Sequence, residues 1–145
     1  MIYERIENFL EVLIEQTKNG NIEWKPMSQY EQEVGATDKM LNVLTMLHGE
    51  FDELHADLCF YFKHNDGVVM IIDETQESGK DGSKQDVLYM LIQCDAKSSV
   101  QRIDYPGMKE DIMRLQAVVA SRFNEQYQID KLYQFMTDIM KQFED

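Results

Sequence analysis

Three apolar runs in the middle of the chain place the strongest constraint on its fold. They read LCFYFK at residues 58–63, VVMIID at 68–73 and VLYMLIQC at 87–94, and each is rich in β-branched and aromatic residues. The first two are joined by His64-Asn65-Asp66-Gly67, and Asp-Gly between such runs is typical of a β-hairpin. The sequence therefore predicts an antiparallel meander, with polar residues 74–86 forming a loop before the third strand.

These predicted strands carry large apolar side chains on both faces. Phe60 and Phe62 point to one side of the sheet, and Cys59 and Tyr61 point to the other. In a sheet with one solvent-exposed face, apolar and polar residues would alternate more strictly along each strand. We therefore expect both faces to be covered, either by helices of this chain or by a second copy, which makes a homodimer one of the predicted arrangements.

The first eighteen residues predict an amphipathic helix. Apolar residues from Ile2 to Ile14 recur at spacings of three and four, and Lys18 and Asn19-Gly20 are favourable at a helix C-terminus. Ile22 and Trp24 then alternate with polar residues like a short strand that ends at Pro26. The Trp24 side chain is expected to be a core residue that seals this helix onto the sheet.

The end of this helix also carries a family resemblance. The pattern Thr-Lys-x-Gly-x-Ile-x-Trp, formed by Thr17, Lys18, Gly20, Ile22 and Trp24, resembles the opening of small uncharacterised bacterial proteins often found among mobile-element genes. The likeness covers about 25 residues. It implies a bacterial α+β domain and no particular activity.

Residues 40–47 fit two structures. Asp38 as a cap and Gly49 as a stop would bracket a short helix, whereas the alternation of Leu41, Val43, Thr45 and Leu47 is typical of a strand. The alternation favours the strand.

The last forty residues return to helical spacing. Pro106 is expected to open one helix, and Asp130 is expected to cap a second after a break at residues 124–128. The apolar side of the second helix would be formed by Leu132, Tyr133, Phe135, Met136, Ile139, Met140 and Phe143. Residues 1–145 are thus predicted to form a single α+β domain, with an antiparallel sheet of about four to five strands, one N-terminal helix and two C-terminal helices.

The net charge and the two cysteines limit which partners, location and cofactors the sequence predicts. The formal net charge is −13, from 27 acidic and 14 basic residues, so direct binding to nucleic acid or to an anionic membrane is disfavoured and a basic protein is the better partner. Cys59 and Cys94 match neither a disulfide framework nor a zinc-ligand spacing, and the N-terminus lacks the pattern of a signal peptide. The sequence therefore predicts a cytoplasmic protein, and it predicts no cofactor.

Two groups of residues are candidate sites. His48, Asp52 and His55 would share one face if residues 48–55 were helical, and imidazole and carboxylate both suit zinc, although Gly49 interrupts such a helix. Glu7, Glu11 and Glu15 form a charged row that could imitate a phosphate strand and bind a basic groove.

These features favour a non-enzymatic, small acidic cytoplasmic protein that acts through protein–protein contacts. One alternative is a metal- or small-ligand-binding enzyme that uses the region of His48, Asp52 and His55. The other is a nucleic-acid-mimicking inhibitor of a basic protein that binds through Glu7, Glu11 and Glu15.

Overall fold

The computed structural model describes residues 2–35, 37–47, 53–77 and 82–144. Its helices are α1 (Ile2–Lys18), α2 (Tyr30–Glu33), α3 (Lys39–Leu47) and α4 (Lys109–Gln142), with 3-10 turns η1 (Met27–Gln29) and η2 (Ala56–Leu58). Its strands are β1 (Lys25–Pro26), β2 (Glu53–Leu54), β3 (Phe60–His64), β4 (Gly67–Glu77), β5 (Lys84–Gln93) and β6 (Gln101–Ile103). The predicted α+β fold with an antiparallel sheet and an N-terminal helix is confirmed.

The sheet is built around β4. Its strands follow the order β1-β3-β4-β5-β6, β2 pairs with β4 beside this path, and all pairs are antiparallel. The predicted hairpin forms, with His64 opposite Gly67. Strands β4 and β5 pair from Val68↔Gln93 to Glu77↔Lys84, so much of the polar segment 74–86, which was predicted to be a loop, lies in strands. The β5 residues of this end, Lys84 to Asp86, are exposed, whereas on β4 Thr75 and Gln76 are half-buried and Glu74 is fully buried.

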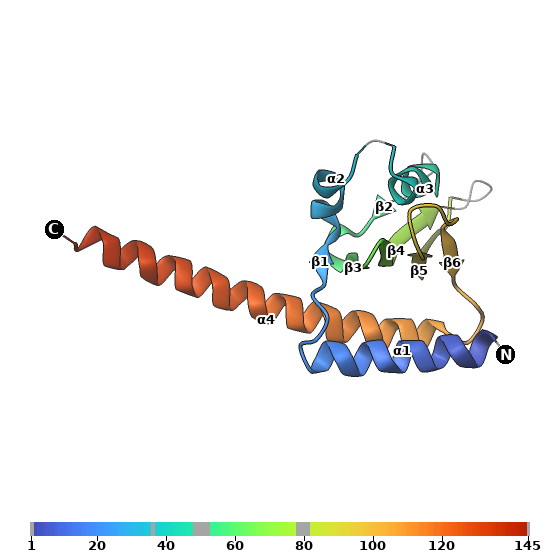
Figure 1. Ribbon diagram of the computed structural model, residues 1–145, viewed down its shortest axis with the longest axis horizontal. Coiled ribbons are helices and arrows are strands. Elements are labelled where there is room, and N and C mark those ends of the chain that lie inside the picture. The colour runs from blue at the N-terminus through green and yellow to red at the C-terminus, as the bar shows by residue number, and fades with distance from the viewer. Residues whose placement is uncertain (1, 36, 48–52, 78–81, 145) are drawn as a thin grey trace.

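Both faces of the sheet are covered by helices of the same chain, as Figure 1 shows. Phe60, Val69 and Ile71 lie in one core with α1 and α4, whereas Tyr61 and Met70 lie in a second core on the opposite face. The second core is completed by Met27, Tyr30, Met40 and Leu44, from η1, α2 and α3. The predicted alternation of core residues along the strands is therefore confirmed.

Helices α1 and α4 lie side by side and run in the same direction (Figure 1). Tyr3 stacks edge-on against Tyr105, with ring centroids 4.7 Å apart, and Arg122 Nη1 donates to Lys18 O at 3.0 Å where α1 ends. Gly20 follows with φ of +77°, which closes the helix as its sequence predicts. Trp24 is buried and donates from its indole nitrogen to Thr17 Oγ1 at 2.9 Å, which confirms its predicted core role.

The prediction of a strand at residues 40–47 is wrong, because α3 occupies this segment. Asp38 Oδ2 accepts a hydrogen bond from the backbone nitrogen of Leu41 at 3.0 Å, which caps the helix. Among residues 39–44, the part of α3 whose side chains are described, the buried ones are Met40 and Leu44, four residues apart, and neither belongs to the alternating set that favoured a strand. Spacing of four places both on one helical face against the sheet.

The prediction of two C-terminal helices is also wrong, because α4 is one helix of 34 residues. It begins at Lys109, after a turn in which Gly107 has φ of +89°, and not at Pro106. No glycine or proline occurs between Lys109 and Gln142, so nothing in the chain forces a break. Asp130 caps no helix; its Oδ1 accepts a bond from Gln126 Nε2 at 2.9 Å, one turn earlier.

In the hairpin turn, the glycine does not have the role expected from the Asp-Gly pair. The residue with positive φ is Asn65, at 54°, whereas Gly67 is required because β4 passes close to the chain beyond β5. A Cβ atom at Gly67 would lie 2.6 Å from Cys94 O and 2.9 Å from Gln93 O. These are backbone atoms, so the clash is not relieved by a side-chain rotation.

We predict that Gly67→Ala lowers the free energy of unfolding by about 1–3 kcal/mol, since the added methyl overpacks a fixed backbone contact. Gly35→Ala is the matched control, because a Cβ there meets nothing within 4 Å. Urea unfolding of both variants measures the effect. Equal stability of the two variants would show that the backbone approach at Gly67 is absent.

Candidate functional site

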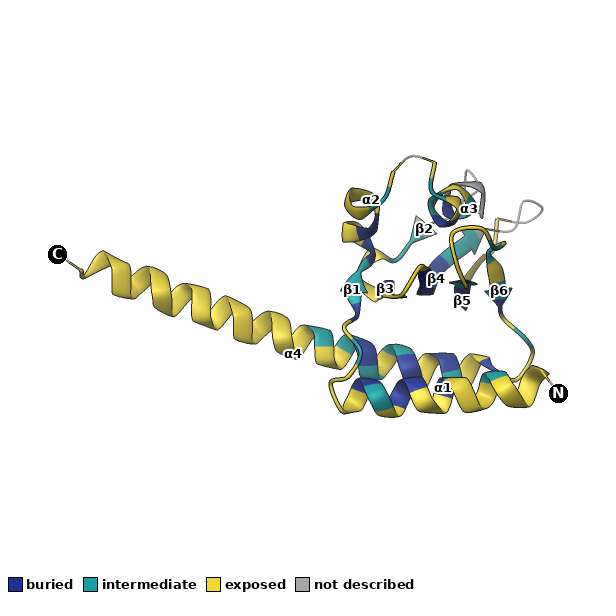
Figure 2. Ribbon diagram, viewed as in Figure 1, coloured by how far each residue is buried: buried dark blue, intermediate teal, exposed yellow. Residues whose placement is uncertain are grey.

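The second half of α4 leaves the body of the protein. Figure 1 shows it extending alone beyond the end of α1, and Figure 2 shows it exposed along its whole length. Each residue from 124 to 144 is exposed, whereas the first half of α4 buries Ile112, Leu115 and Val119. We call residues 124–144 the arm. At 1.5 Å rise per residue the arm is about 30 Å long.

The arm carries large apolar side chains in contact with water. The exposed fraction reaches 66% for Tyr133, 64% for Phe135 and 78% for Phe143. The other exposed apolar residues of the arm are Tyr127, Ile129, Leu132, Met136, Ile139 and Met140. Single exposed apolar residues are normal on a protein surface, but a contiguous patch of this kind marks an interaction site.

The apolar residues of the arm follow a heptad pattern. With Ile129 at position a, the a and d positions are filled by Ile129, Leu132, Met136, Ile139 and Phe143. The flanking e and g positions add Tyr133, Met140 and Phe135. Spacings of three and four residues place these side chains on one side of a helix, which is the pattern by which one helix packs along another. The opposite side holds the polar residues, among them Asp130, Gln134 and Lys141.

The arm has little to stabilise it as an isolated helix. Between residues 129 and 143 its charged side chains are Asp130, Lys131, Asp138 and Lys141, so their charges cancel. The side-chain hydrogen bonds along the described arm span one turn each, from Gln126 to Asp130 and from Gln134 to Asp138, both at 2.9 Å. Such local pairs contribute only a few tenths of a kcal/mol each, so a helical segment of this length depends on packing for its stability.

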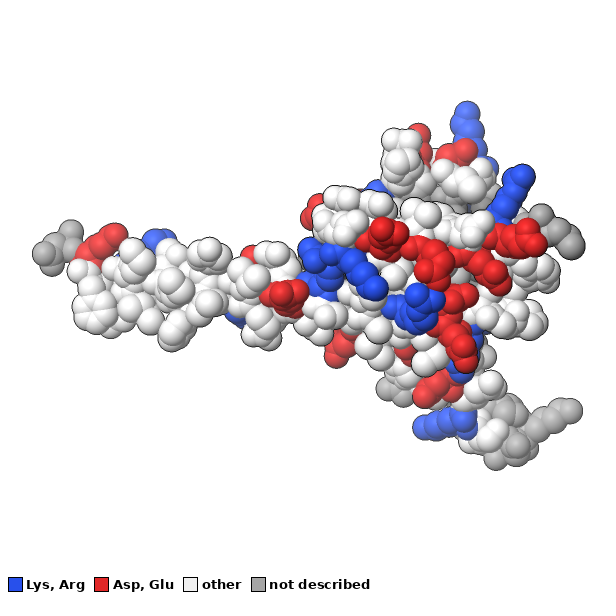
Figure 3. Space-filling model, turned by 90° about the horizontal axis from the view of Figure 1, so that it is seen from below, with Lys and Arg blue, Asp and Glu red and all other residues white. Residues whose placement is uncertain are grey.

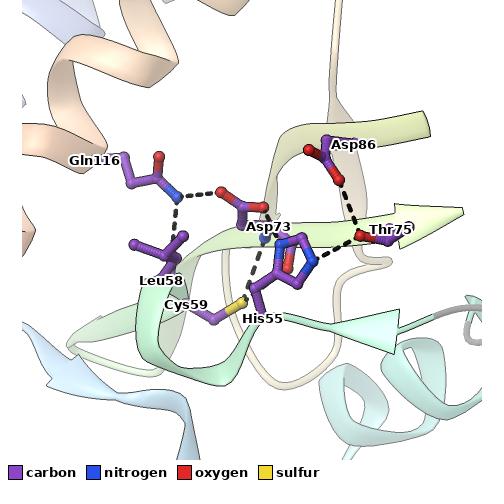
Figure 4. Close-up of polar contacts among 7 residues, drawn as sticks. All are labelled: His55, Leu58, Cys59, Asp73, Thr75, Asp86 and Gln116. Atoms are coloured by element: carbon purple, nitrogen blue, oxygen red, sulfur yellow. Dashed lines mark hydrogen bonds and ion pairs between the residues drawn. The ribbon is translucent and has the colours of Figure 1, made fainter. Parts of the chain in front are cut away.

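A network of polar side chains surrounds His55. Of the three predicted metal ligands, His55 is the one that lies in a described segment. Figure 4 shows its ring between two strand residues: Nδ1 lies 2.7 Å from Asp73 Oδ1, and Nε2 lies 2.6 Å from Thr75 Oγ1. Gln116 Nε2, on α4, donates to Asp73 Oδ2 at 2.7 Å and to Leu58 O at 3.0 Å. The network therefore ties η2, β4 and α4 together.

A hydroxyl, an imidazole and a carboxylate in this order are also the parts of a nucleophile relay. In this network, however, the carboxylate of Asp86 also accepts from Thr75 Oγ1, at 2.9 Å, so His55 shares the hydroxyl group with a charged acceptor. Nearby, burial raises the pKa of the Cys59 thiol to about 12, so this cysteine is not a ready nucleophile.

The predicted metal site is only partly covered by the described residues. His48 and Asp52 lie outside them, so the proposed grouping with His55 stays a prediction. Both ring nitrogens of His55 already contact Asp73 and Thr75, and a metal ion would have to displace one of these partners. Within the described segments, no group of three or more His, Cys, Asp or Glu side chains is placed to hold a metal ion.

The acidic row on α1 lies at the surface, as predicted, with Glu7, Glu11 and Glu15 all exposed. It is not purely negative, because Arg114 Nη1 on α4 donates to Glu11 Oε1 at 2.7 Å. Figure 3 views this side of the molecule, where basic side chains lie among the acidic ones. Binding of a basic partner at this row stays a prediction.

Comparisons with models of protein families, with curated proteins and with solved structures found no match to this chain. The resemblance at Thr17 to Trp24 therefore stays a prediction. Within the described residues, no helix combines the length and the apolar character needed to cross a membrane.

We predict that two leucines of α4 contribute very differently to the stability of the monomer. Leu115→Ala should lower the free energy of unfolding by about 2–5 kcal/mol, since Leu115 is fully buried. Leu132→Ala should change it by less than about 0.5 kcal/mol, since Leu132 is 58% exposed. Urea unfolding at low protein concentration tests this. A large loss for Leu132→Ala under these conditions would mean that the arm packs on the body.

We predict that Gln116→Glu makes stability depend on pH. The new carboxyl would lie beside Asp73, and repulsion between the two would raise the pKa of the pair in the folded state. A raised folded-state pKa means that stability is retained at low pH and is lost as pH rises through that pKa. The free energy of unfolding should therefore fall by about 1–3 kcal/mol relative to the native chain at neutral pH, and the difference should shrink on acidification.

Gln116→Met is the control for this experiment, since it removes the same hydrogen bonds without adding a charge. Its stability difference from the native chain should change less with pH than that of Gln116→Glu, because it adds no titrating group. An equal pH dependence in both variants would show that the added carboxyl does not lie beside Asp73.

Proposed function

We propose that this protein is a non-enzymatic cytoplasmic module that acts through protein–protein contacts, and that the arm is its contact surface. The observation that carries the proposal is the stripe of large apolar side chains at heptad spacing on a part of α4 whose described residues are all exposed. A stripe of this kind is stabilised only when another surface removes it from water.

The distribution of charge supports the same proposal. The chain carries a net charge of −13, yet the charges of residues 129–143 cancel. Figure 3 shows the arm largely free of charged side chains, whereas acidic and basic side chains crowd the body. Depletion of charge around a core of aromatic residues and methionine is typical of the centre of a protein interface.

The amount of apolar surface is also appropriate. The exposed side chains of the arm together offer on the order of 1,000 Å² per chain, comparable with the ~800 Å² that each partner buries in an interface of standard size. Aromatic residues such as Tyr133, Phe135 and Phe143 are the type that contributes most to binding when fully buried.

We predict that a photo-crosslinking amino acid in place of Leu132 forms a covalent adduct with a protein inside cells that express the chain. The same amino acid in place of Gln134 is the matched control, since Gln134 lies on the polar side of the same helix. Denaturing electrophoresis detects the adduct. The proposal is wrong if position 132 yields no adduct, or if both positions yield the same adducts in equal amounts.

A further inference from the structure

We propose that the arm packs against the arm of a second copy of this chain. The two arms would run antiparallel, with a two-fold axis that crosses the seam between them at the level of Gln134. This inference rests on the proposed function and names the partner of the same surface. Four observations carry it: the course of the apolar stripe along α4, the pairing of its residues, the length of the arm and the position of the charged bodies.

The stripe continues the surface of α4 that already packs on a helix. In the same heptad register, Leu115 and Arg122 occupy a positions in the first half of α4. Leu115 is buried in the core shared with α1, and Arg122 donates to the last turn of α1. The arm begins where α1 ends, so a second helix would take the place along α4 that α1 leaves vacant.

The stripe is complementary to itself in one antiparallel register. With the axis beside Gln134, Ile129 lies opposite Ile139 of the second copy, and Leu132 lies opposite Met136, so each a position meets a d position. The residues nearest the axis are Tyr133 and Phe135, and each would flank its own symmetry mate. All side chains of this central part of the seam are apolar, and the polar positions, among them Asp130 and Asp138, stay on the outside.

The length of the arm fits the same register. Gln134 is the midpoint of residues 124–144, so the two arms would overlap from end to end. The tip of each arm would then reach the base of the other, near the point where α1 ends (Figure 1). A register chosen to match a with d positions therefore also covers the apolar side of the arm along its length, with Phe143 opposite Glu125 at each end.

Electrostatics favours the antiparallel over the parallel direction. The charges of residues 129–143 cancel, so the net charge of −13 belongs to the rest of the chain. A parallel pair would place both acidic bodies at the same end of the seam, where like charges repel. An antiparallel pair places them at opposite ends, about 30 Å of helix apart, well beyond the ~8 Å Debye length at physiological salt.

Disulfide cross-linking distinguishes the two directions. In a Cys94→Ser background, which removes the exposed thiol and keeps the buried Cys59, a cysteine is placed at Phe135, Met136 or Thr137. In the antiparallel pair, position 135 lies beside its own mate, whereas position 136 lies opposite residue 132. We expect Phe135→Cys to give a covalent dimer on mild oxidation, and Met136→Cys and Thr137→Cys to remain monomers.

A dimer of Met136→Cys together with a monomer of Phe135→Cys would indicate parallel pairing and overturn the inference. Analytical ultracentrifugation of the unmodified native chain provides the second readout. We expect a dimer that Leu132→Asp converts to a monomer of unchanged circular dichroism in the strand region. A native chain that sediments as a monomer at every concentration would also overturn the inference.

The mass of the photo-crosslinked adduct separates this inference from the proposed function. An adduct of twice the chain mass at position 132 supports self-pairing. An adduct with a different protein overturns self-pairing and leaves the proposed function standing, whereas the absence of any adduct overturns both.

Discussion

The whole structure depends on burying β4 on both faces. Its residues alternate between two cores, with Val69 and Ile71 on one side and Met70 and Ile72 on the other. A strand of this kind is stable only in a sheet that is covered twice. The chain covers one face with α1 and α4, and it covers the other with η1, α2 and α3 (Figure 1). This use of helices decides which surfaces are left for other molecules.

The arm is the part of α4 that is not used to cover the sheet. Helix α1 has 17 residues and α4 has 34, so only the first half of α4 finds both a sheet and a helix to pack against. The second half carries apolar residues at heptad spacing, and it is exposed along its length, as Figure 2 shows. Apolar side chains that are exposed on a helix carry a free-energy cost of about 25 cal/mol per Å² of surface left in water, which a partner would remove.

Much of the body follows from the sequence, because its elements are determined by local patterns. The hairpin around Asn65, the α1 helix closed at Gly20 and the core position of Trp24 all agree with the predictions. The prediction for residues 40–47 is wrong because apolar residues there fit both strand alternation and helical spacing. Packing of Met40 and Leu44 against the sheet favours the helix. Most of the apolar residues of the arm were also recognised, but as one side of a second helix after a break that does not exist.

The exposure of the arm could not be predicted from sequence for a related reason. Heptad spacing shows that a helix has an apolar side, but it does not show whether that side meets its own sheet or leaves the body. The His55 network was missed because Asp73, Thr75 and Gln116 come from distant segments and share no local spacing. Only the pairing of β2 with β4, and the packing of α4 nearby, bring them together.

Hydrogen exchange measured at two protein concentrations tests the central claim most directly. An isolated arm should exchange its amide hydrogens quickly, since a helix of this length without packing is only marginally stable. The account predicts that protection across residues 128–142 increases with concentration, while protection of β4 stays constant. Protection of the arm that is the same at both concentrations, whether high or low, would contradict the claim that a second copy covers it.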